Sequence, residues 1–123
     1  MNDLTQCRYD LAAELEAAGV PATVDPGAVL TLVTQYGVCA LIQKPRSYTP
    51  LTYGLDFDLV VPVWLITAAP DDADALERLE DALVLAWPVT RPVEETNPTT
   101  YEGADQSMPA LVIPTGRHVT CQP

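Results

Sequence analysis

The strongest pattern in the chain is the apolar run from Phe57 to Thr67, which has the sequence FDLVVPVWLIT. Consecutive side chains of a β-strand point to opposite faces of the sheet, so the run predicts a long strand with apolar residues on both faces. One face carries Phe57, Leu59, Val61, Val63 and Leu65, and the other carries Val60, Trp64 and Ile66. Pro62 interrupts the run. Because proline cannot donate to a ladder, it predicts an edge strand or a bulge at this position.

A helical period replaces the strand pattern after Thr67. Asp71 is a suitable N-cap and Pro88 a suitable stop, so we predict a helix between them. Its apolar arc consists of Ala75, Leu76, Leu79, Ala82, Leu83 and Ala86. Val84 and Leu85 break the pattern, because they fall on the side of the helix that is otherwise polar.

A second helix, from Leu4 to Ala18, is predicted near the start of the chain by apolar residues at three- and four-residue spacing: Leu4, Cys7, Leu11, Leu15 and Ala18. Asp3 is placed as its N-cap, and Gln6 stands three residues later, as in a capping box. Gly19 follows at the position where a left-handed residue commonly ends a helix.

Two short strands are predicted after this helix, at residues 20–24 (VPATV) and 38–42 (VCALI). The second is a continuous apolar run, which is typical of a strand covered on both faces. The segment 28–36 between them is ambiguous, because its alternating apolar residues lack firm boundaries.

Residues 43–55 (QKPRSYTPLTYGL) hold two prolines, two tyrosines and two of the six basic residues. This composition between two strands predicts a long hairpin arm. Near the C-terminus, residues 89–103 predict a loop with a short strand. Ala110–Ile113, enclosed by Pro109 and Pro114, predicts a last strand, and residues 115–123 either add a strand or stay mobile.

Together these elements predict a single domain spanning residues 1–123. The fold class is α+β, with a mostly antiparallel sheet, two helices packed on one face and a long hairpin arm. A chain of 123 residues with 48% hydrophobic content can bury one core without metal or disulfide staples.

The charge of the chain excludes several kinds of partner. The net charge is −11, whereas binding to nucleic acids or anionic membranes needs clustered Lys and Arg. We therefore expect no direct nucleic-acid binding and no membrane association. No 18-residue apolar run and no signal peptide are present, and three widely spaced cysteines indicate reduced thiols in a cytoplasmic setting.

Catalytic or metal-binding patterns are weak. His118 and Cys121 could supply two metal ligands, but a zinc site needs three or four. A Cys–His nucleophilic pair lacks a third orienting group, and helix capping accounts for the aspartates around Asp72. Glycine-rich phosphate loops are missing. The expectation is a protein that is not an enzyme, with no catalytic residue, cofactor or metal.

Signals of interaction are stronger. The arm, the proline-bearing strand and the two misplaced apolar residues fit a protein that buries surface against copies of itself. The predicted interface with another subunit or a partner consists of Lys44, Arg46, Tyr48, Tyr53, Pro62, Val84 and Leu85.

The run LVVPVWLITAAPDDADALERLEDAL resembles the tail terminator family of long-tailed (siphovirus-type) bacteriophages. Further similar segments are VPATVDP, VCALIQKPR, PVTRPVEETNPTTYEG and MPALVIPTGR, in the same order along the chain. The segment from Gly27 to Tyr36 departs from the resemblance, because it is longer than the family pattern at that place.

This resemblance implies a ring, commonly a hexamer, that caps the head-proximal end of the tail tube and stops its polymerisation. The implied partners are further copies of the chain, the tail tube protein and the head–tail connector protein. The implied location is the tail of the virion, and the host cytoplasm during assembly. The alternatives are another neck or minor tail protein, such as a head-completion protein, and a cytoplasmic binding subunit or small enzyme.

Overall fold

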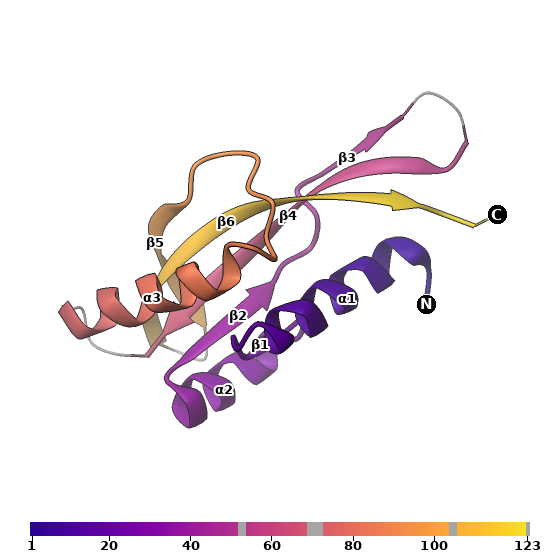
Figure 1. The fold of residues 1–123 in the computed structure, drawn as a ribbon. Helices are drawn as coiled ribbons and strands as arrows, with labels where there is room; N and C mark the ends of the chain where they lie inside the picture. Colours follow the sequence, from indigo (N-terminus) through magenta and orange to yellow (C-terminus); the bar gives the residue numbers. More distant parts are fainter. Residues whose placement is uncertain (52–53, 69–72, 104–105, 123) are drawn as a thin grey trace.

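The computed structural model describes residues 1–51, 54–68, 73–103 and 106–122, which form one sheet with helices on both faces (Figure 1). The strand order is β1-β2-β4-β6-β5, and β3 pairs with β4 beyond the end of β2. The elements are α1 (Asp3–Ala17), β1 (Ala22–Thr23), η1 (Pro26–Ala28), α2 (Val29–Tyr36), β2 (Val38–Ile42), β3 (Ser47–Pro50), β4 (Asp56–Thr67), α3 (Ala73–Ala86), β5 (Asn97–Gly103) and β6 (Gln106–Thr120). Only the β1–β2 pair is parallel among the strand pairs of the described residues, which confirms an α+β fold with a mostly antiparallel sheet.

β4 and β6 form the central ladder, which extends from the pair Asp56–Thr120 to the pair Ile66–Ala110. The predicted alternation along β4 is confirmed. Leu59, Val61, Val63 and Leu65 are buried in one core, and Ile66 packs with Trp64 in a second core on the other face. Apolar side chains on both faces allow β4 to carry two separate layers of structure.

Pro62 lies opposite Pro114 within an unbroken register of this ladder, so the prediction of an edge strand or a bulge at Pro62 is wrong. The Pro62 carbonyl accepts from the Gln43 N–H at 3.0 Å, and the Pro114 carbonyl accepts from the Val93 N–H at 2.9 Å. Both carbonyls therefore point away from the other strand. The backbone N and O of one residue lie on the same side of a strand. The ring nitrogens of Pro62 and Pro114 therefore also point away from the other strand. The two prolines form a non-hydrogen-bonded pair and cost the ladder no bond.

β6 continues through both of the prolines that the sequence suggested as its limits. The predicted strand Ala110–Ile113 is correct but too short, because β6 begins at Gln106 and ends at Thr120. Pro109 pairs with Thr100 of β5 at a point where the β4 ladder has already ended at Ala110. Each proline thus occupies a position where one neighbouring strand is missing, which is where a missing N–H is harmless.

α1 and α3 pack on the same face of the sheet, which confirms the predicted pair of helices on one face. Leu11 and Leu15 of α1 and Leu79, Ala82 and Ala86 of α3 are buried there with the inward side chains of β4. Leu76 was assigned to this core from the sequence, but 52% of it is exposed, so that assignment is wrong. The buried arc of α3 is narrower than predicted and consists of Ala75, Leu79, Ala82 and Ala86.

The N-cap of α1 is Asn2, not Asp3. The Asn2 Oδ1 accepts from the Thr5 N–H at 2.7 Å, whereas the Asp3 carboxylate accepts from the Gln122 backbone N–H at 2.8 Å. Asp3 therefore fastens the C-terminal segment to the first turn of the helix. Asp71, the predicted N-cap of the later helix, lies outside the described residues.

The ambiguous segment 28–36 forms helix α2 on the opposite face of the sheet, after the short 3₁₀ turn η1. Val29 and Val33 are one helical turn apart and pack against Cys39, Ile66 and Met108. Gly37 ends the helix with φ 85°, a left-handed conformation that favours glycine. The sequence analysis missed this helix, because only the second core defines which of its side chains are buried.

Substitutions on α3 test the corrected core. Leu79→Ala should lower the free energy of unfolding by about 2–5 kcal/mol, because a buried leucine leaves a cavity. Leu76→Ala, the same change three residues earlier on the exposed side, should alter it by less than about 0.5 kcal/mol. Urea unfolding of the two variants measures the difference. Equal losses of unfolding free energy would mean that Leu76 is buried in the core.

Candidate interaction surface

Large apolar side chains are exposed along α3 and the segment that follows it. The predicted interface residues Val84 and Leu85 are 71% and 48% exposed. Leu76, Trp87 and Val93 are also about half exposed, and the sequence analysis did not place them on an interface. A tryptophan beside the helix stop at Pro88 was the available signal for this extension. These five residues, Leu76, Val84, Leu85, Trp87 and Val93, are called the α3 patch below.

Carboxylates surround the most exposed residue of the α3 patch. Val84 stands two helical turns after Glu77 and within one turn of Glu80 and Asp81, so all four side chains share the outer side of α3. None of the three carboxylates makes an ion pair within the described part of the chain. The outer side of α3 therefore carries an apolar spot at the C-terminal end of an acidic row.

On one flank of α3, Leu85 and Tyr36 line a hollow of about 220 Å³. The C-terminal end of α2 and the turn at Gly19 form its other walls, and Arg78 and Asp81 also line it. Tyr36 is 56% exposed, so both of its apolar side chains are partly open to solvent. This hollow extends the exposed apolar surface of α3 toward α2.

β3 forms the described part of the predicted arm. It pairs with β4 from Ser47–Val60 to Pro50–Phe57, so the arm continues the main sheet and is held by its ladder. Tyr48 is 51% exposed and Lys44 is also exposed. Arg46 forms a two-pronged ion pair with Glu94, at 2.7 and 3.3 Å, which joins the base of the arm to the segment after α3. Tyr53 lies outside the described residues.

The predicted interface residues thus fall in three places. Lys44, Arg46 and Tyr48 lie together on the arm, and Val84 and Leu85 lie together on α3. Pro62 belongs to neither group, because it is half-buried in the middle of the sheet. Figure 1 places β3 at the upper right of the molecule and α3 toward the left, so the two groups form separate surfaces.

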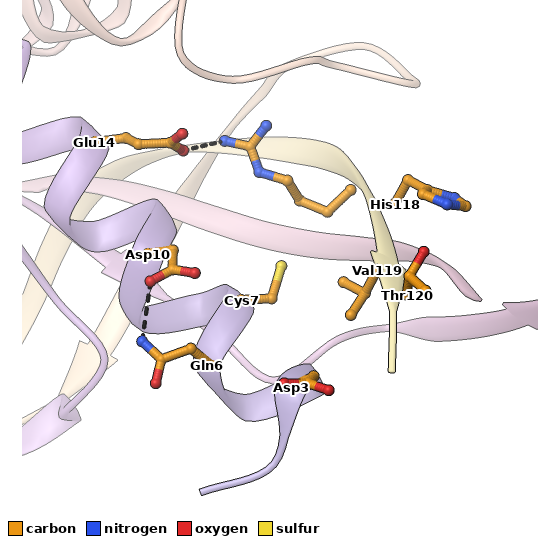
Figure 2. A pocket seen from close by; sticks show the side chains of 9 residues that line it. Asp3, Gln6, Cys7, Asp10, Glu14, His118, Val119 and Thr120 are labelled. Carbon is orange, nitrogen blue, oxygen red and sulfur yellow. Dashed lines mark hydrogen bonds and ion pairs between the residues drawn. The ribbon is translucent and has the colours of Figure 1, made fainter. Parts of the chain in front are cut away.

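A second hollow, of about 350 Å³, lies between α1 and the last part of β6 (Figure 2). Asp3, Asp10 and Glu14 give it an acidic lining. Cys7 and Val119 point toward each other across it, whereas His118 points away. The hollow therefore brings a thiol close to carboxylates but not to a histidine base.

The thiol of Cys7 is not activated as a nucleophile. Burial is the main cause that raises its pKa, and the carboxylates of Asp10 and Glu14 raise it further against the opposing effect of the Arg117 guanidinium. Arg117 is itself engaged, because it donates to the Glu14 carboxylate and to the Val89 carbonyl at 2.9 Å each. A nucleophilic cysteine needs a lowered pKa, so this hollow lacks the electrostatics for such catalysis.

His118 and Cys121 do not form a metal centre in the described part of the chain. His118 Nδ1 lies 3.2 Å from a carboxylate oxygen of Asp58 on the adjacent strand, and no group of three or more metal-ligating side chains occurs among the described residues. Cys7, Cys39 and Cys121 are all free thiols. Among the described helices, none is long and apolar enough to span a membrane.

Comparisons with known proteins add no relatives: no family model, curated protein or solved structure matches this chain.

Thiol reactivity tests the burial of the second core. Burial raises the pKa of Cys39 to about 12. Because the thiolate is the reactive form, alkylation of Cys39 at pH 8 should be at least about 1,000-fold slower in the folded protein than in urea. Mass spectrometry of iodoacetamide-treated protein measures both rates. Similar rates in the two states would mean that β2 is not covered by α2.

Proposed function

We propose that this chain is a tail terminator of a long-tailed bacteriophage, a structural subunit that forms a ring at the head-proximal end of the tail tube. The observation that carries the proposal is the α3 patch. Val84 and Leu85 are neighbours on α3 and Trp87 follows within one turn, and clustered exposed apolar side chains of this kind mark protein–protein contacts. The resemblance of the run through β4 and α3 to tail terminators supports the choice of assembly partner.

Two separate surfaces on one subunit support closure into a ring. In a ring, each subunit uses one surface to meet a different surface of the next, so the two must be distinct and rigidly related. The arm and the α3 patch satisfy this requirement, because β4 connects directly to the arm and carries α3 on its buried face.

The acidic charge is compatible with a conduit for DNA. A net charge of −11 repels phosphates, so DNA would pass through a ring of such subunits without binding to its wall. This part of the proposal requires carboxylates at the lumen. Placement of the acidic side chains on the outer rim of an assembled ring would exclude it.

Another neck protein remains the nearest alternative, and a binding subunit with a small ligand is the second. The acidic hollow of Figure 2 is the feature that favours the second alternative, because three carboxylates converge on it. A cationic ligand that raises the melting temperature of a stable monomer would support that function instead.

Self-association provides the first test. The wild-type chain should form rings at micromolar to millimolar concentration, detected by light scattering and negative-stain microscopy. Val84→Lys should weaken association at least tenfold, because it places a charge in the centre of the α3 patch. The fold should survive, since Glu80 and a lysine at position 84 make a favourable pair one turn apart. Thr31→Lys, an exposed change on α2, is the control and should leave association unchanged.

Tube growth provides the more specific test. The tail tube protein of the same phage should polymerise into long tubes alone, and into short tubes with a ring at one end when the chain is added. Val84→Lys should fail to shorten the tubes, and Thr31→Lys should act as wild type. Rings that form but leave tube length unchanged would identify a different neck protein.

A further inference from the structure

We propose that the arm of one copy docks on the outer side of α3 of the next copy, with Tyr48 against Val84 and Lys44 beside the carboxylates of α3. This inference rests on the proposed ring and names the contact that closes it. It also commits the α3 patch to one occupant, a second copy of the same chain.

Charge complementarity is the first argument. The arm, residues 43–55, contains Lys44 and Arg46 and no acidic residue, in a chain of net charge −11. The helix α3 contains four carboxylates and a single guanidinium. Lys44 makes no hydrogen bond or ion pair among the described residues, and neither do Glu77, Glu80 and Asp81. A free cation on one surface thus matches free anions on another.

The arrangement of the side chains is the second argument. Exposure alternates from residue 44 to residue 48, so Lys44, Arg46 and Tyr48 face solvent while the residues between them are half-buried. The arm therefore presents an aromatic ring at one end of a basic row. α3 presents an apolar spot, Val84, at one end of an acidic row that begins at Glu77. Each surface has one apolar and one charged end.

The two rows also agree in length. Lys44 and Tyr48 are four residues apart, which is at most about 13 Å, because the chain bends at Arg46 before β3 begins. Glu77 and Val84 are seven residues apart on a helix, which is about 10 Å. Long Lys and Tyr side chains cover the difference. When Tyr48 lies on Val84, Lys44 therefore reaches the neighbourhood of Glu77 and Glu80.

The described part of the arm that would make this contact is held in place within the subunit. The ladder with β4 holds Tyr48 opposite Leu59, and the ion pair between Arg46 and Glu94 fixes the base of the arm. An arm held in place loses little further conformational freedom on docking, which favours affinity. Lys44 remains the free cation of the arm, so we assign the electrostatic contact to Lys44 and the positioning of the arm to Arg46.

Mixing of two defective variants tests the contact directly. Variant A, with Lys44→Glu and Tyr48→Ala, lacks the arm surface, and variant B, Val84→Lys, lacks the α3 surface. Each alone should be monomeric. A mixture should give a 1:1 complex and nothing larger, because the intact arm of B can dock on the intact α3 of A. Sedimentation equilibrium and titration calorimetry at up to about 0.5 mM would detect one such contact, as micromolar to sub-millimolar binding.

Charge reversal gives an independent measurement. Lys44→Glu and Glu77→Lys should each weaken association at least tenfold, and the chain that carries both changes should recover most of the loss, because the pair is restored with opposite polarity. Thr49→Ala, an exposed change beside Tyr48 on β3, is the matched control and should associate as wild type.

The outcomes separate this contact from the ring itself. If the wild-type chain forms rings but A and B do not combine, or if A alone still forms rings, the arm does not dock on α3 and the tail terminator proposal stands. If B alone still forms rings, the α3 patch is not an interface, and both the docking contact and the observation that carries the tail terminator proposal are lost. If the wild-type chain neither associates nor shortens tail tubes, both proposals are wrong. A self-association of A or of B into pairs would indicate a symmetric contact between like surfaces and would also overturn the inference.

Discussion

The pairing of β4 with β6 is the constraint on which the rest of the structure depends. These two strands share a long antiparallel register and carry apolar side chains on both faces. Two cores can therefore form on one ladder, with α1 and α3 over one face and α2 over the other. Burial of apolar area is the main favourable term in folding, and in this chain nearly all of it is organised around these two strands.

The prolines determine where neighbouring strands leave this ladder. Pro62 and Pro114 face each other with their nitrogens pointing away from the shared ladder. Neither proline can therefore donate a hydrogen bond to a carbonyl of the segment on its outer side. On one side, Gln43 and Arg46 still donate to the Pro62 and Val60 carbonyls, but residues 44 and 45, between β2 and β3, have no ladder partner among the described residues. On the other, Pro92 forms a single bridge to Thr115 before β5 begins. Arg46 lies in the first of these interrupted regions and Glu94 in the second, and their ion pair connects the two regions across the sheet. The base of the arm is thus a consequence of the proline pair.

The surface combines features that a monomer does not need. The α3 patch exposes large apolar side chains, the carboxylates around Val84 lack partners in the described chain, and the arm carries a free cation and an exposed tyrosine. Three ion pairs join the described residues, and apart from Arg117 their side chains are largely exposed. Exposed pairs contribute little to stability. Contacts between copies would satisfy these groups together, which is the physical basis of the assembly role that we propose. The acidic hollow beside Cys7 lacks an activated nucleophile and does not offer an equally complete alternative.

The sequence alone determined the elements whose pattern is local. Alternation predicted β4 and its two faces, and helical spacing predicted α1 and α3. The position of Val84 and Leu85 on the polar side of the helix predicted that they would be exposed. Tertiary structure decided the rest. The segment that became α2 is too short to show a period without a second core to define its buried side. Pro62 alone suggested an edge strand, because proline has no N–H to donate to a neighbouring strand. The tertiary structure pairs Pro62 with Pro114 and directs both ring nitrogens away from the β4–β6 ladder, so no ladder bond is lost. Leu76 fits an apolar arc, but the way α3 packs on the sheet leaves it in solvent. Local patterns indicate which side chains are apolar and therefore gain from burial. Which residues bury each of them depends on segments that are distant in the chain.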